Sequence, residues 1–267
     1  MFGVVPQTLW QRVNPPDAKN LCTWAARLLL IETGDRKILV DTGMGDKQDA
    51  KFRSHFEPHG EETMTGELLK SMILPEEITD VFLTHLHFDH VGGAVKYDEL
   101  GSLVPTFPNA TYWTNEKHWQ HAMSPNMKEK ASFLKENFVP LKEEGRLQVV
   151  DIQRDRVEWL AGINIRFAHG HTESLMALEI DLGDKKLIYG ADLMPASYYI
   201  SIPWVMSYDI RPLVSLEEKT ILLTETVDNG DILFFEHDPR IECGTLKRNE
   251  KGRIVLDKAL TLEEALK

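Results

Sequence analysis

The chain has 267 residues, a length that fits one or two domains at about 150 residues per domain. Apolar residues make up 42% and charged residues 27% of it, which excludes collagen-like, disordered and disulfide-scaffold classes. The formal net charge of −12 disfavours nucleic acids and anionic membrane surfaces as partners. There is neither an apolar run long enough for a membrane helix nor a secretory signal pattern, and Cys22 and Cys243 are expected to stay reduced. We therefore expect a cytoplasmic protein.

Apolar runs and turn residues predict alternating strands and helices in the first part of the chain. A strand-turn-strand pattern turns at Gly34-Asp35, and a buried strand leads to the most unusual stretch of the sequence. The predicted strands are residues 25–32, 37–40, 80–84 and 109–113, and the predicted helices are residues 46–56, 62–72, 114–122 and 127–137.

The second part of the chain is rich in predicted hairpins. Ser215 and Glu218 form a capping-box pattern that predicts a helix start, and Asn229-Gly230 predicts its end. A last hairpin turns at residues 249–252, and a short helix follows Thr261. The predicted strands are residues 146–151, 156–160, 163–168, 175–180, 185–190 and 231–235. Two similar halves of this kind favour one layered α/β domain over residues 1–267.

The sequence Thr84-His85-Leu86-His87-Phe88-Asp89-His90-Val91-Gly92-Gly93 follows the predicted buried strand. In extended backbone, residues i and i+2 point the same way, so His85 and His87 could bind one metal ion. Asp89 and His90, where the chain turns, could then face another ion. We expect Gly92 and Gly93 to let the backbone turn tightly beneath the metals.

Further His and Asp residues follow later predicted strands. These are His169-Gly170-His171-Thr172, Gly190-Ala191-Asp192 and Phe235-Glu236-His237-Asp238. Sites carried by a sheet assemble at strand ends. We therefore expect these segments to complete one site with the first cluster.

These motifs resemble the metallo-β-lactamase superfamily, nearest to its branch of N-acyl homoserine lactonases and organophosphate hydrolases. The HxHxDH motif is matched by residues 85–90, and the early Asp-Thr-Gly element by Asp41-Thr42-Gly43. The later family elements are matched by Gly170-His171-Thr172, Gly190-Ala191-Asp192 and His237, so the resemblance covers about residues 25–240. It implies a four-layer αββα sandwich with the site at one edge of the two sheets.

The resemblance also implies the roles of the site residues. His85, His87 and His171 would bind the first metal, Asp89, His90 and His237 the second, and Asp192 would bridge them. Such donors suit two zinc ions, although manganese, iron or cobalt could bind to the same atoms. Two ions would generate a hydroxide nucleophile, and Asp89 could orient it and return a proton to the leaving group.

Other residues near these motifs have different expected roles. The family assigns the residue at Asp41 to support of the metal loop, with a surface turn as the alternative. His169 has no family counterpart, and we expect it not to bind metal. The histidines outside the matched elements are expected to be exposed to solvent: His55, His59, His118 and His121.

Several branches of the superfamily do not fit this chain. The residues after His237 read mainly as a hairpin rather than the helical glutathione-binding domain of glyoxalase II enzymes. The acidic chain lacks the basic cluster of an RNA-processing nuclease. It also lacks the flavodoxin module of flavodiiron oxidoreductases. The remaining hypothesis is a hydrolase of small esters or lactones, with organophosphates as alternative substrates and an iron-dependent persulfide or redox enzyme as the second class.

The segment after Asp192 provides candidate substrate contacts. It is apolar and aromatic from Leu193 to Met206 and could line an acyl or aryl pocket. Well-known lactonases have a tyrosine three residues after the bridging aspartate, where this chain has Pro195. Tyr198 or Tyr199 could replace it. The expected partner is a small ester or lactone, with no nucleic acid and no membrane, and a homodimer stays open.

Overall fold

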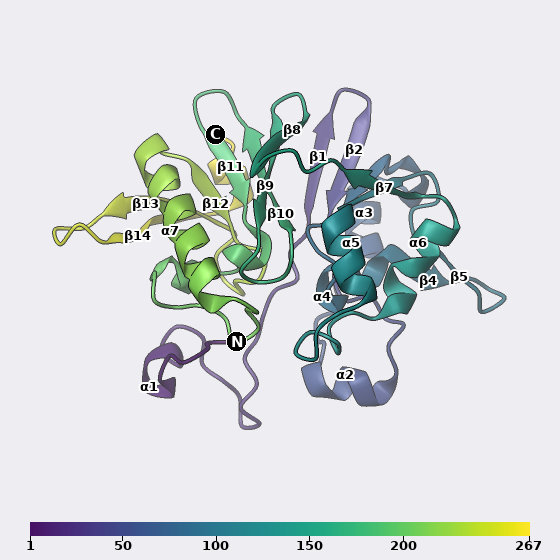
Figure 1. Cartoon of the computed structure of the whole chain (residues 1–267), viewed down its shortest axis with the longest axis horizontal. Helices are drawn as coiled ribbons and strands as arrows, with labels where there is room; N and C mark the ends of the chain where they lie inside the picture. Colours follow the sequence, from purple (N-terminus) through teal and green to yellow (C-terminus); the bar gives the residue numbers. More distant parts are fainter. The chain divides into compact units, whose positions relative to one another are not determined.

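The computed structural model describes residues 1–267, and contacts between Cα atoms divide the chain into two compact units. The central unit is Leu28–Asp151, and the terminal unit combines Met1–Arg27 with Ile152–Lys267. Each unit has one large β-sheet accompanied by helices (Figure 1), so the predicted α/β class is confirmed. No helix is both long and apolar enough to span a membrane. The single domain over residues 1–267 stays a prediction.

The central unit contains a five-stranded sheet in the order β1-β2-β3-β6-β7. The first pair is antiparallel and the other pairs are parallel. The large sheet's strands are β1 (Leu29–Thr33), β2 (Arg36–Val40), β3 (Asp80–Phe82), β6 (Thr111–Asn115) and β7 (Leu147–Val150). A separate hairpin pairs β4 (Val95–Tyr97) with β5 (Leu103–Pro105). The helices are α2 (Ala50–Phe56), α3 (Met64–Lys70), α4 (Phe88–Val91), α5 (Glu116–Met123) and α6 (Val139–Glu143).

The parallel pairing determines where the conspicuous sequence motifs of this unit lie. β2 is aligned with β3, and β3 with β6, so the three strands end at one edge of the sheet. All three residues of β3 are buried, as expected for a strand covered on both faces. Asp41 directly follows β2, and Thr84 and His85 closely follow β3. The carboxyl edge of this sheet is therefore where polar side chains gather.

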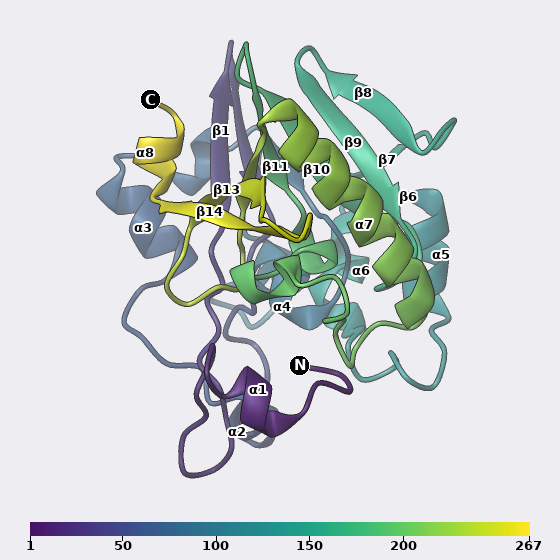
Figure 2. The ribbon, with the colours of Figure 1, turned by 90° about the vertical axis from the view of Figure 1, so that its left-hand side faces the viewer.

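The terminal unit contains a seven-stranded sheet in the order β14-β13-β12-β11-β10-β9-β8. Helix α7 packs against β13 and β14 and runs along the sheet in Figure 2. The strands are β8 (Arg156–Leu160), β9 (Ile163–Ala168), β10 (Leu175–Asp181), β11 (Lys186–Tyr189), β12 (Ile232–Phe234), β13 (Cys243–Arg248) and β14 (Ile254–Leu260). The α-helices are α1 (Gln7–Trp10), α7 (Pro212–Asn229) and α8 (Leu262–Ala265), with 3-10 turns at Ala191–Leu193 and Ser197–Ile200.

Strand direction again collects the motifs of this unit at one edge. β11 is parallel to β12, and β9 and β11 are both antiparallel to β10, so β9, β11 and β12 run the same way. His171 follows β9, Asp192 follows β11, and His237 follows β12. Ligands of α/β sheets bind outside the carboxyl ends of the strands. This edge therefore has the position and the side chains of a binding site.

Several predicted helix bounds differ from the structure, and two of these differences have a clear physical reason. The predicted helix at residues 127–137 is helical only at Lys135–Asn137, because the Asn126 side chain accepts from the backbone N–H groups of Lys128 and Glu129 and forms a turn. Helix α7 begins at Pro212 rather than after Ser215, since proline fits the first helical position. Its predicted end is confirmed, with Gly230 at φ +74°.

Candidate metal centre

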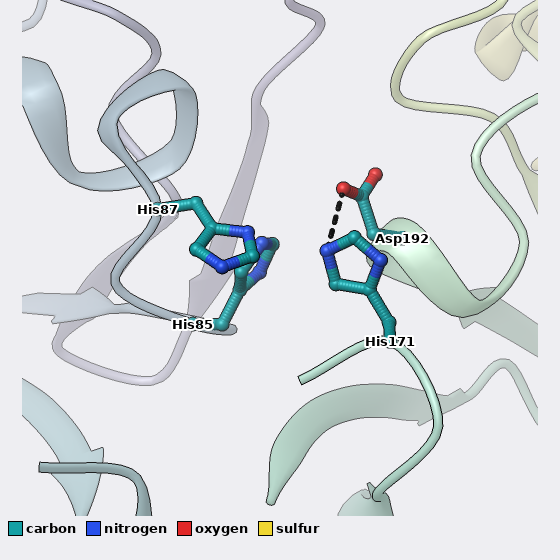
Figure 3. Close-up of side chains that lie close together, drawn as sticks. All are labelled: His85, His87, His171 and Asp192. Carbon is teal, nitrogen blue, oxygen red and sulfur yellow. Dashed lines mark ion pairs between the residues drawn. The ribbon is translucent and has the colours of Figure 1, made fainter. Parts of the chain in front are cut away.

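The central unit presents three buried imidazoles and one half-buried carboxylate within six residues. The ring centroid of His85 lies 4.6 Å from that of His87 and 3.9 Å from that of His90. Figure 3 shows the rings of His85 and His87 next to each other. Asp89 stands in the first turn of α4 and is the most exposed of the four, with its Oδ2 3.9 Å from His90 Nε2. The sequence motif thus forms a compact donor group.

Asp41 lies beneath this donor group and is fully buried. Its Oδ1 accepts from the Thr84 backbone N–H at 2.8 Å, and its Oδ2 accepts from the Thr84 hydroxyl at 2.6 Å and from His90 Nδ1 at 3.0 Å. Thr84 Oγ1 in turn lies 3.1 Å from Nδ1 of His85. These contacts exclude the surface-turn alternative and support the expected role of Asp41 beneath the metal loop. They also turn Nδ1 of His85 and His90 toward protein oxygens, so Nε2 is the ring nitrogen that a metal ion would use.

His87 is oriented the other way round. Its Nε2 lies 3.3 Å from Oε1 of Glu129, which is buried. A carboxylate only accepts hydrogen bonds, so His87 donates from Nε2, and Nδ1 is the ring nitrogen that a metal ion would use. No local pattern singles out Glu129, because it lies 42 residues from His87 in the chain.

His118 was expected to be exposed, and this expectation is wrong. It is fully buried in α5, where its Nε2 accepts from the backbone N–H of Leu86 at 2.8 Å. His118 therefore fixes the backbone between His85 and His87. His121 is also half-buried rather than exposed, because its Nε2 lies 2.7 Å from Glu129 Oε2. His55 and His59 are exposed, as expected.

The two glycines after His90 serve close packing rather than a special turn. The chain turns tightly here, as expected, in a 3-10 turn at Gly92–Ala94, but neither glycine has a positive φ, so the turn itself does not require glycine. A Cβ on Gly92 would lie 1.9 Å from the carbonyl oxygen of Met44, and one on Gly93 would lie 2.3 Å from that of Thr42. Lys47 donates from Nζ to the carbonyls of Gly92 and Val95, while burial lowers its pKa to about 8. Any larger residue at 92 or 93 would push the metal loop away from residues 42–44.

The terminal unit presents two imidazoles on one carboxylate. Asp192 Oδ2 lies 3.1 Å from His171 Nε2, and Asp192 Oδ1 lies 3.2 Å from His237 Nε2. Figure 3 shows the ion pair between His171 and Asp192. All three side chains are buried. Ala191, which precedes Asp192, has φ +45°, a strained conformation of the kind that clusters at functional sites.

The Nδ1 atoms of His171 and His237 each contact an oxygen atom of the protein. His171 Nδ1 lies 3.0 Å from Oδ1 of buried Asp209, and His237 Nδ1 lies 2.7 Å from the carbonyl oxygen of Ala25. Sequence reasoning missed Asp209, which stands in an irregular segment with no motif around it. The loop before His171 is fixed by Glu218, whose carboxylate accepts from the N–H groups of His169 and Gly170.

The donor chemistry fits divalent metal ions. Four histidines of the expected ligand set have Nδ1 next to a carboxylate, hydroxyl or backbone carbonyl, and His87 has Nε2 next to a carboxylate. Metal-binding histidines donate their other ring N–H to such acceptors, which orients the ring and raises its basicity. Imidazole and carboxylate donors suit zinc and neighbouring divalent metals. Each unit thus contributes histidine and aspartate side chains whose chemistry suits a divalent metal ion.

Tyr198 and Tyr199 lie on the turn after Asp192 and are buried. The Tyr198 hydroxyl accepts from Asn14 Nδ2 at 3.2 Å, and the Tyr199 hydroxyl donates to the Met1 carbonyl at 3.1 Å. Burial raises the pKa of both phenols, so they remain protonated. Their contact with substrate stays a prediction. Pro195, at the position where relatives have tyrosine, accepts a hydrogen bond from the His237 backbone N–H through its carbonyl.

His169 is half-buried, and its Nδ1 lies 3.1 Å from Oε1 of Glu173. Its expected lack of a metal-binding role stays a prediction.

Comparison with known proteins agrees with the motifs. The model of the Metallo-beta-lactamase superfamily matches residues 28–237. An N-acyl homoserine lactonase of Bacillus cereus is 22% identical over 255 residues, which cover 87% of each chain. A probable metal-dependent hydrolase from Staphylococcus aureus superposes with a TM-score of 0.83 at 24% identity, covering 98% of this chain and 92% of that one. AidC, described as a dizinc quorum-quenching lactonase in complex with a product, superposes with a TM-score of 0.71 at 23% identity, covering 90% and 81%.

The chain belongs to the metallo-β-lactamase superfamily, because the family model matches most of its length. The expected fold class and the resemblance to the lactonase branch are confirmed. The chain is a hydrolase of that superfamily with His/Asp metal-binding groups.

Proposed function

We propose that the chain is a dinuclear-metal hydrolase that cleaves a small ester or lactone, such as an acyl-homoserine lactone. The observation that carries this proposal is the pair of donor groups at the carboxyl edges of the two sheets, with the second nitrogen of each imidazole next to a protein oxygen. The lactonase relatives support the substrate class.

The proposed ligand set is the one that the family resemblance implies. His85, His87 and His171 would hold one ion, Asp89, His90 and His237 would hold the other, and Asp192 would be shared by both. The contacts of Asp192 with both His171 and His237 support the bridging role, since its two carboxylate oxygens face one imidazole each. Zinc is the proposed metal, and manganese, iron and cobalt suit the same donors.

The residues around the donors have separate tasks in catalysis. When bound, two divalent ions supply a hydroxide nucleophile at neutral pH and polarise the substrate carbonyl. Asp89 is half-buried, so its carboxylate can orient the attacking hydroxide, accept its proton once the new C–O bond has formed, and return that proton to the leaving alkoxide. Tyr198 can donate to the developing oxyanion, because its hydroxyl accepts from Asn14 and keeps its own proton for a further partner.

The apolar surroundings of these tyrosines favour a neutral substrate with an acyl or aryl arm. Phe2 stacks on Trp10 with ring centroids 4.7 Å apart, and Trp24 lies edge-on to Tyr198 at 5.9 Å. Aromatic side chains of this kind line small-molecule sites in proteins. The net charge of −12 disfavours polyanionic substrates. We also propose a cytoplasmic location.

Metal analysis combined with a substrate panel tests the proposal. Protein reconstituted with zinc should hold close to two ions per chain and should hydrolyse an acyl-homoserine lactone or a neutral aryl ester. Chelation should abolish this activity, and zinc, manganese or cobalt should restore it, whereas RNA and glutathione thioesters should be cleaved poorly. A saturating content near one ion would contradict the dinuclear site. Inactivity on lactones, esters and organophosphates, with sulfur-dependent oxygen consumption by the iron form, would favour a persulfide enzyme instead.

A further inference from the structure

Glu129 is a buried carboxylate that connects two histidines of the central unit. It is 2% exposed, and its Oε1 lies 3.3 Å from His87 Nε2 while its Oε2 lies 2.7 Å from His121 Nε2. Oε2 also accepts from Asn126 Nδ2. None of Glu129, His121 and Asn126 belongs to the metal-binding motif. The three residues nevertheless place a negative charge directly behind His87.

The segment that carries Glu129 is anchored to the motif by its backbone. The Asn126 side chain accepts from the Glu129 backbone N–H at 3.1 Å, and the Ser132 N–H donates to the Glu129 carbonyl at 2.8 Å. Ser132 then accepts from the backbone N–H of Phe88, the neighbour of His87, at 2.9 Å. The position of the carboxylate relative to the His87 ring is therefore set by main-chain contacts as well as by the side-chain contact.

Phe133 packs the same rings from another direction. Its ring centroid lies 4.7 Å from that of His87 and 5.8 Å from that of His121. A carboxylate among such neighbours carries a large desolvation cost, which apolar residues of similar volume would avoid. Stability alone therefore gives no reason for a glutamate at this position.

We infer that Glu129 is a positioning residue for the metal centre: by accepting the Nε2–H of His87, it fixes the tautomer and ring orientation that present Nδ1 to the metal. His121 and Asn126 in turn hold the second carboxylate oxygen, so the carboxylate cannot rotate away. Partners of this kind raise the basicity of a metal-binding imidazole. The inference rests on the proposed function only in taking His87 as a metal ligand.

The test measures zinc affinity rather than turnover. Glu129→Gln keeps the size of the side chain but removes its charge and replaces one acceptor oxygen by an NH2 group, so His87 and His121 no longer both have an acceptor. Competition with a chromophoric chelator should show zinc affinity at one of the two sites reduced by about 10–100-fold. The cobalt form should show a changed visible absorption spectrum, and excess zinc should restore hydrolysis of a lactone.

Glu173→Gln is the matched control. Glu173 Oε1 lies 3.1 Å from Nδ1 of His169, a histidine outside the proposed ligand set, so zinc affinity should stay at the wild-type value. His121→Phe is a second test that keeps the carboxylate but removes the donor to Glu129 Oε2, and it should lower zinc affinity by a smaller factor than Glu129→Gln. This variant decides the question if Glu129→Gln does not fold.

Unchanged zinc affinity in a folded Glu129→Gln protein, or in His121→Phe where the first variant does not fold, would overturn the inference. An equal loss in Glu173→Gln would also overturn it, since the effect would then be a general result of lost charge. A wild-type protein that binds two zinc ions but hydrolyses no lactone or ester would refute the proposed function and leave the affinity test of Glu129 intact.

Discussion

Asp41 and His90 lie 49 residues apart in the sequence, yet Oδ2 of Asp41 is 3.0 Å from Nδ1 of His90, and both side chains are fully buried. The contact exists because β2 and β3 are parallel and end at the same edge of the sheet. Asp41 also has φ +58°, a conformation that aspartate and asparagine tolerate better than most residues. The strand pairing therefore places an anion directly behind a proposed metal ligand.

Asp41→Asn should lower metal affinity although it removes no proposed ligand. Asparagine tolerates the same backbone conformation, so the variant tests the charge behind His90 rather than backbone strain. We expect affinity to fall by about 10–100-fold, the usual loss when a partner of a metal-binding histidine is replaced. Chelator competition on the folded protein measures it.

Asp80→Asn provides the matched control for this prediction. Asp80 is also a buried aspartate of the same sheet, but it pairs with Arg36 and accepts from the Trp113 indole. This change should reduce stability and leave metal affinity unchanged. Equal losses of affinity in both variants would refute the specific role of Asp41.

Asp192→Ala should reduce the content of both metals and abolish activity. Its carboxylate lies 3.1 Å and 3.2 Å from the Nε2 atoms of His171 and His237, and in the proposed site it neutralises two ions at once. Elemental analysis after dialysis against metal-free buffer measures the content. Retention of two ions per chain would show that Asp192 does not bridge them.

His169→Ala should leave metal content unchanged. His169 is not a proposed ligand, and its side chain contacts Glu173, which is not one either. The same dialysis applies to this variant. Loss of an ion would exchange the roles of His169 and His171.

The sequence was sufficient to single out the histidines and aspartates that the structure gathers at each sheet edge, but not the residues that orient them. The spacing of His85, His87, Asp89 and His90 is enough to indicate a cluster of donors, because extended backbone presents alternate residues on one side. Asp209 and Glu129 have no comparable local pattern. They reach their histidines only through the tertiary fold, so a single sequence contains no signal that separates them from surface acids.

Errors in the predicted elements have the same origin. Residues 127–137 carry apolar residues at helical spacing, which predicted a helix. In the structure Phe133 instead packs against the rings of His87 and His118. Glu218 matches a capping box only by coincidence, because its carboxylate holds the backbone before His171 instead. Strands such as β8 and β9 were predicted at their observed bounds, since runs of alternating or continuous apolar residues decide strands locally.

Because of Lys219, the free energy of unfolding should increase between about pH 8 and pH 10.5. Its Nζ donates to the carbonyls of Ser201 and Trp204, and burial lowers its pKa to about 8 from 10.5. Between these two values the unfolded chain still holds the proton that the folded chain has lost, so the free energy of unfolding increases as pH rises. Below about pH 8, Lys219 is protonated in both the folded and the unfolded chain, and burial of its charge opposes folding.

The measurement compares the wild type with Lys219→Met by denaturant unfolding from pH 7 to pH 10.5. The stability of the wild type relative to the variant should increase across this range, most steeply above about pH 8. Subtracting the two curves removes the titration of all other groups. A flat difference would show that the Lys219 pKa is the same in the folded and unfolded chains.

Tyr198 and Tyr199 are neighbours, but the hydroxyl group of Tyr198 accepts a hydrogen bond whereas that of Tyr199 donates one. We therefore predict different roles for the two residues. Tyr199 donates to the Met1 carbonyl, so Tyr199→Phe should lower stability by about 1 kcal/mol and leave kcat unchanged. Tyr198 accepts from Asn14 and retains its own proton, so Tyr198→Phe should lower kcat by about 10²–10³-fold if that proton stabilises the oxyanion. KM should change little, because the oxyanion exists only in the transition state. Steady-state kinetics on a neutral lactone, with thermal unfolding as the stability control, decides between them. Equal kcat for Tyr198→Phe and the wild type would remove Tyr198 from the proposed mechanism.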